Sequence, residues 1–173
     1  MNDTASSTAI DRAWRIHGSL SDSIGRVDVK AAFALSLETA ALVAITSAVR
    51  SMPTGPSPQW RHPALVVILW LSAVLVGSAL LFAVAAVVPR IGANDSTDDW
   101  PSNTVYFGHL RRWPAAELAE SLAEQDLLPA LSRQLVALSR IAWAKHTKVR
   151  TSLALGGIGV ALAGLAAMMS SMT

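Results

Sequence analysis

The chain has 173 residues and a formal net charge of +2; 52% of its residues are apolar and only 15% are Asp, Glu, Lys or Arg. A soluble globular domain usually carries about 25% charged residues, so this composition is atypical of a soluble protein. The sequence has no cysteine, which excludes a disulfide scaffold, a thiolate nucleophile and a cysteine-ligated metal site. The small net charge argues against nucleic acid as a partner.

Three stretches of the chain are almost free of charged side chains. Residues 64–88 and 152–171 contain none, and residues 31–50 contain only Glu38 and the terminal Arg50. About 20 apolar residues in a helix cross a bilayer core that is about 30 Å thick. The sequence therefore predicts an all-α membrane protein with transmembrane helices at these three places.

The remaining residues form an amino-terminal arm (1–30), a short loop (51–63) and a larger segment (89–151). Lysine and arginine are concentrated in the arm and the larger segment, whereas the short loop and its border hold only Arg50 and Arg61. The positive-inside rule then predicts that the N-terminus and the larger segment are cytoplasmic and that the loop is external. The expected location is the cell inner membrane, which the chain crosses several times.

The arm and the larger segment both show helical patterns. In the arm, apolar residues recur at helical spacing, which predicts a short amphipathic helix on the membrane surface or against the cytoplasmic segment. In the larger segment, one helix is predicted to begin at Pro114 and a second near Pro129. No helix breaker follows, so residues 130–171 are predicted to form one helix that runs from a small cytoplasmic helical module into the third span.

Enzyme motifs are absent from the sequence. It contains no Walker loop, no HExxH, no GxSxG and no pair of carboxylates placed as acid and base. The larger segment is also too short for an enzyme domain of ordinary size. We therefore expect no catalytic site, no metal site and no bound cofactor. We also expect His146, together with Lys145 and Lys148, to lie on a solvated helix face.

Four stretches resemble the transmembrane effectors of Pycsar anti-phage systems: DVKAAFALSLETAAL, PRIG, VYFGHLRRWPAAELAESL and LSRQLVALSRIAWAKHTKVRTSL. They lie within residues 26–155, and FGHL combined with the SRQL and IAWAKH stretch is the more specific signal. The resemblance implies that a partner cyclase makes cCMP or cUMP upon infection. It also implies that this nucleotide activates the effector, which then compromises the inner membrane and causes abortive infection.

A cyclic mononucleotide needs a cation for its phosphate and an aromatic face for its base. The segment VYFGHLRRWP (105–114) and the helix after it supply both types. Our hypothesis is that one of two adjacent arginines holds the phosphate while an aromatic ring stacks on the base. The predicted nucleotide-binding residues are Tyr106, His109, Arg111, Arg112, Trp113, Arg133 and Arg140.

Each of these residues also has a purely structural interpretation. Arg133 and Arg140 can pair with an acidic stripe on the preceding helix. Arg111 and Arg112 can meet anionic lipid headgroups. The aromatic residues can form the core of a small module.

Two features of the predicted spans bear on membrane damage. Small residues at Gly159, Ala163 and Ala167 step by four along the third span, which favours either self-association into a homo-oligomer or packing against the first two spans. Glu38 lies about 12 Å along its helix from Lys30. It either lines the lesion that the activated effector forms in the lipid bilayer, or sits nearer the interface. Alternative functions are a small proton-coupled transporter subunit that uses Glu38, or a membrane-anchored scaffold.

Overall fold

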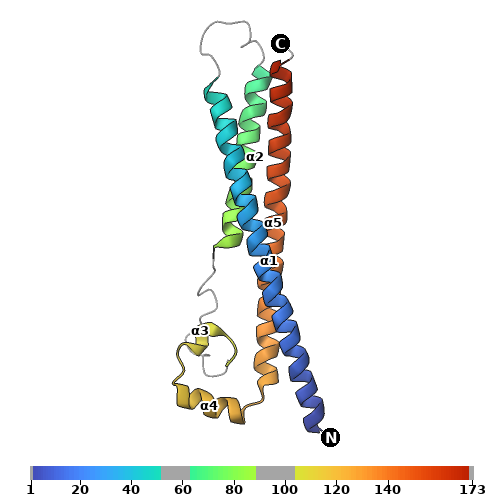
Figure 1. Ribbon diagram of the computed structural model, residues 1–173, viewed down its shortest axis with the longest axis vertical. Coiled ribbons are helices and arrows are strands. Elements are labelled where there is room, and N and C mark those ends of the chain that lie inside the picture. Colours follow the sequence, from blue (N-terminus) through green and yellow to red (C-terminus); the bar gives the residue numbers. More distant parts are fainter. Residues whose placement is uncertain (1, 52–62, 89–103, 172–173) are drawn as a thin grey trace. The chain divides into compact units, whose positions relative to one another are not determined.

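The computed structural model describes residues 2–51, 63–88 and 104–171, and the secondary structure in these ranges is helical (Figure 1). The helices are α1 (Asn2–Arg50), α2 (Pro63–Val87), α3 (Phe107–Leu110), α4 (Ala115–Glu124) and α5 (Leu127–Ser171). Helices α1, α2 and α5 are each long and apolar enough to cross a membrane. The predicted all-α architecture with three membrane-spanning helices is confirmed.

The chain divides into two compact units, which are described separately below. The first, here called the module unit, comprises residues 1–26 and 89–143. The second, here called the span unit, comprises residues 27–88 and 144–173. Helices α1 and α5 each contribute residues to both units.

Small side chains form the interior of the span unit. Helix α2 buries a residue at every third or fourth position: Leu69, Ser72, Val76, Ala79, Ala83 and Ala86. The opposing face of α5 buries Val149, Ser152, Gly156, Gly159 and Ala166. Small residues at helical spacing let helices approach closely in lipid. Large apolar side chains such as Phe33, Trp70 and Leu81 are exposed on the outside of the unit, as expected for a surface that faces lipid.

In the module unit, particular residues explain where α4 and α5 begin. Pro114 is the N-cap residue of α4, with φ −63° and ψ 138°. Helix α5 begins directly after Asp126, whose Oδ1 accepts a hydrogen bond from the N–H of Leu128 at 3.0 Å. Pro129 lies in the first turn of α5, where its missing N–H costs nothing. The predicted helix starts near Pro114 and Pro129 agree with these positions.

The structure differs from the sequence prediction at the amino-terminal arm. The arm and the first span are predicted as separate segments that meet at residue 30, but α1 is one helix from Asn2 to Arg50. No proline interrupts this range, so nothing forces the helix to end between the amphipathic and the apolar part. The predicted loop 51–63 and the first part of the segment 89–151 fall mainly outside the described residues.

Helix α5 is continuous over its whole predicted length. The sequence predicts one helix over residues 130–171, and α5 runs from Leu127 to Ser171. Because α5 contributes to both units, one helix carries residues of the module unit and residues of the span unit.

Candidate functional site

The predicted nucleotide-binding residues from Tyr106 to Trp113 form one tight turn of the module unit. The carbonyl of Tyr106 accepts hydrogen bonds from the N–H groups of His109 and Leu110, both at 3.0 Å. The ring of His109 is buried and meets the ring of Tyr106 edge to face, with centroids 5.2 Å apart and planes at 88°. A Cβ at Gly108 would overlap the ring of Tyr106, so this close approach needs glycine.

Both arginines of this turn follow the aromatic pair directly. The N–H of Arg112 donates to the carbonyl of His109 at 2.9 Å, and Nε of Arg111 donates to the carbonyl of Gly108 at 3.1 Å. Arg111 is exposed, whereas Arg112 and Trp113 are half-buried. The turn therefore holds two guanidinium groups at or near the surface, beside aromatic rings.

Arg133 and Arg140 lie on α5 and line a cleft of their own. They are exposed and seven residues apart, which places them on one helix face. Apolar Val136 and Ile141 lie between and beside them in a cleft of about 570 Å³. The described lining residues all belong to α5, so the structure brings these two arginines together without adding residues of the 106–113 turn.

Glu38 lies in the interior of the span unit. Its side chain is 6% exposed, and its Oε1 accepts a hydrogen bond from Ser152 Oγ at 2.6 Å. A Cβ at Gly156 would lie 3.1 Å from Glu38 Oε1 and 3.6 Å from Ala79 Cβ, so the carboxyl group is closely surrounded by small residues of α2 and α5. The carboxyl group therefore faces neighbouring helices instead of lipid.

Four polar contacts follow one face of α5 through the span unit. They join Lys145 Nζ to Asp28 Oδ1 (2.5 Å), Lys148 Nζ to the carbonyl of Ala85 (2.7 Å), Ser152 Oγ to Glu38 Oε1 (2.6 Å), and the carbonyl of Gly159 to Ser72 Oγ (2.7 Å). The α5 positions are three, four and seven residues apart, which keeps them on one face. The contacts hold α5 alternately to α1 and to α2.

Sequence reasoning missed most of these contacts. Lys145 and Lys148 are predicted on a solvated face, but the side chain of Lys145 is only 18% exposed because it pairs with Asp28. The sequence predicts no role for Ser72 or Ser152. Hydroxyl groups inside apolar spans indicate possible contacts between helices, but the sequence does not show which helix each hydroxyl group faces.

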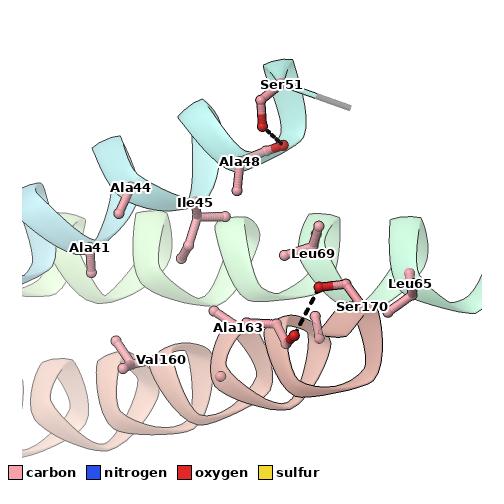
Figure 2. A pocket seen from close by; sticks show the side chains of 13 residues that line it. Ala41, Ala44, Ile45, Ala48, Ser51, Leu65, Leu69, Val160, Ala163 and Ser170 are labelled. Atoms are coloured by element: carbon pink, nitrogen blue, oxygen red, sulfur yellow. Dashed lines mark hydrogen bonds between the residues drawn. The ribbon is translucent and has the colours of Figure 1, made fainter. Parts of the chain in front are cut away.

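The predicted small-residue face of α5 contacts more than one surface. Gly159 packs against α2, since a Cβ there would lie 2.7 Å from Val76 Cγ2. Ala163 and Ala167 line an apolar cleft of about 600 Å³ between α1, α2 and α5 (Figure 2). Self-association through Ala163 and Ala167 stays a prediction, and Gly159 makes an intramolecular contact.

The fold and these contacts define a small α-helical membrane protein whose third spanning helix also carries arginines of a separate module. A sequence model of the family described as the Pycsar effector protein domain matches residues 12–170. The chain therefore belongs to the Pycsar effector family, so it is a membrane protein of anti-phage defence that acts in a system with a partner cyclase. The predicted family is confirmed. No curated protein and no solved structure matches the chain.

Proposed function

We propose that this effector is activated by a cyclic pyrimidine mononucleotide, cCMP or cUMP, and then impairs the integrity of the inner membrane, which leads to abortive infection. The observation that carries the proposal is the continuity of α5 from Leu127 to Ser171. Arg133 and Arg140 lie on its part in the module unit, and Ser152 lies on its part in the span unit. In this proposal a bound nucleotide displaces α5, and the displacement reaches the span because the same helix carries residues of both units.

The module unit offers the chemistry that such a nucleotide requires. Arginine forms charge-assisted, bidentate hydrogen bonds with phosphate oxygens. In this proposal Arg111 or Arg112 holds the phosphate, and Tyr106 or Trp113 stacks on the base. The ring of His109 meets the ring of Tyr106 in a T-shaped contact. No catalytic site and no cofactor are needed for this role.

The proposal also covers the orientation of the protein in the membrane and its assembly into oligomers. The module unit and the N-terminus lie in the cytoplasm, where a messenger made by the cyclase reaches the arginines. The distribution of lysine and arginine along the sequence supports this orientation. Several copies assemble into a homo-oligomer through the small residues Ala163 and Ala167, which line a cleft open to further packing.

Binding by the full-length protein tests the proposal. Calorimetric titration with cCMP and with cUMP compares the wild type with Arg111→Ala, Arg112→Ala, Arg133→Ala and Arg140→Ala. A lost charge-assisted hydrogen bond costs about 1.5–3 kcal/mol, so at least one variant is expected to bind about ten- to hundredfold more weakly. Arg12→Ala, an exposed arginine of α1 outside the candidate site, is the matched control. Wild-type affinity in all four variants would remove these arginines from the site.

Glu38 favours a second candidate function, a small proton-coupled transporter subunit, because a carboxyl group inside a helix bundle is the usual titrating group of such carriers. The transporter predicts flux without any nucleotide. The effector predicts that membrane potential collapses only when a pyrimidine cyclase is co-expressed. A membrane-anchored scaffold predicts neither effect.

A further inference from the structure

Glu38 is an unusual group in the span unit. It is the only Asp, Glu, Lys, Arg or His in residues 31–49, 64–88 and 152–171. Its Oε1 accepts the hydrogen bond from Ser152, but its buried Oε2 has no hydrogen-bond partner among the described residues. A buried polar atom without a partner costs free energy, and ionisable residues within spans generally mark ion pathways.

Two lysines on the same face of α5 as Ser152 make contacts with groups other than the Glu38 carboxyl group. Lys145 pairs with Asp28, and Lys148 donates to the carbonyl of Ala85. Neither contact reaches the carboxyl group of Glu38, whose described hydrogen bond comes from a neutral hydroxyl group. In the resting bundle, these contacts of the two lysines therefore leave the Glu38 carboxyl group with a neutral partner.

Helix α5 packs tightly against this carboxyl group in the resting bundle. Gly156 of α5 lies so close that a single added Cβ would be 3.1 Å from Glu38 Oε1 and 3.3 Å from its Cγ. Three residues further along α5, the Gly159 carbonyl accepts a hydrogen bond from Ser72 Oγ. Separation of α5 from α1 and α2 would expose the Glu38 carboxyl group on α1, the Ser72 hydroxyl group on α2, and the Ser152 hydroxyl group and the Gly159 carbonyl on α5. All of these groups carry oxygen atoms that can coordinate a cation.

We propose that Glu38 makes the activated effector selective for monovalent cations, and that Ser152 masks this carboxyl group in the resting bundle. The inference rests on the proposed function and makes it more specific: the damage is an aqueous path lined by Glu38, through which K⁺ and Na⁺ pass in preference to Cl⁻. Rings of acidic side chains select cations in channels because a carboxylate in a narrow path attracts cations and repels anions.

The experiment measures reversal potentials of the full-length protein in planar bilayers under a KCl gradient, with cCMP or cUMP on the side of the module. For the wild type, the reversal potential is expected near the K⁺ equilibrium potential. In Glu38→Gln, which keeps an acceptor for Ser152, the nucleotide-dependent conductance remains and the reversal potential moves toward zero. Glu38→Asp retains the charge and is expected to retain cation preference.

Asp22→Asn removes an exposed acid of α1 outside the span unit and is the matched control, with unchanged selectivity expected. Wild-type selectivity in Glu38→Gln, or an anion-selective wild type, would overturn the inference while leaving the proposed function standing. A wild-type protein without nucleotide-dependent conductance would overturn the proposed function itself, and this outcome is seen before any variant is compared.

Discussion

Replacing Gly159 by alanine tests how closely α5 packs on α2. The added Cβ would lie 2.7 Å from Val76 Cγ2, 3.1 Å from the carbonyl oxygen of Ser72 and 3.2 Å from the backbone nitrogen of Val76. The valine methyl group cannot turn away easily, because β-branched side chains have one strongly preferred rotamer in a helix. The other two atoms belong to the backbone, so α2 and α5 must move apart by a few tenths of an ångström.

The expected cost follows from these contacts. Inserting a methyl group into a well-packed interior costs about 1–3 kcal/mol. The same shift lengthens the hydrogen bond from Ser72 Oγ to the carbonyl of Gly159, and an interhelical hydrogen bond in lipid contributes about 0.6 kcal/mol. With about 2–4 °C per kcal/mol for a chain of this size, Gly159→Ala is expected to lower Tm by several degrees.

Gly157 provides the matched control for Gly159→Ala. A Cβ at Gly157 meets nothing within 4 Å, so Gly157→Ala makes the same change of helix propensity without the clash. Thermal unfolding in detergent micelles, followed by tryptophan fluorescence, compares the two variants. Equal Tm values for both would refute the packing argument. A stable Gly159→Ala monomer that no longer assembles would instead indicate that Gly159 mediates contacts between copies.

Two further predictions concern the polar contacts of α5. Ser72→Ala removes the hydrogen bond to the Gly159 carbonyl and is expected to lower the free energy of unfolding by about 0.6–1.7 kcal/mol; Ser78→Ala, whose hydroxyl group bonds only within α2, should have the smaller effect in the same assay. Lys145→Asp places two acids together and is expected to destabilise the bundle. Adding Asp28→Lys reverses the pair and should restore most of the lost stability, up to about 1 kcal/mol. A double-mutant cycle measures this recovery, and no recovery would show that the ion pair contributes nothing.

The spans were predictable because their cause is local. Residues 64–88 lack charges and are bounded by prolines, so the length and both ends of α2 follow from the chain itself. The start of α5 also has a local cause. Asp126 caps the helix, and Pro129 is accommodated in its first turn, where no N–H group is needed. The boundary at residue 30 follows a change in composition, and α1 continues across it because a change in composition does not end a helix.

The candidate site was predictable only in part. The residues from Tyr106 to Trp113 are neighbours in the sequence, so their gathering in one turn needed no tertiary information. The edge-to-face contact of Tyr106 with His109 and the close approach of Tyr106 to Gly108 are also local, but they depend on side-chain conformations that the residue pattern does not give. Arg133 and Arg140 share a face by helical periodicity alone. The described lining residues of the cleft beside them all belong to α5 and recur at helical spacing as well.

Composition and periodicity by themselves determined that this chain crosses a membrane with three helices, where those helices lie, and that the last one extends beyond the lipid. The family resemblance was also readable from the sequence, because it rests on linear motifs. Only the tertiary structure decided that Glu38 meets Ser152, that Ser72 meets Gly159, and that Lys145 is paired with Asp28. The physical reason is that a helix fixes which residues share a face, whereas the rotation and axial register between helices depend on how all their faces pack together.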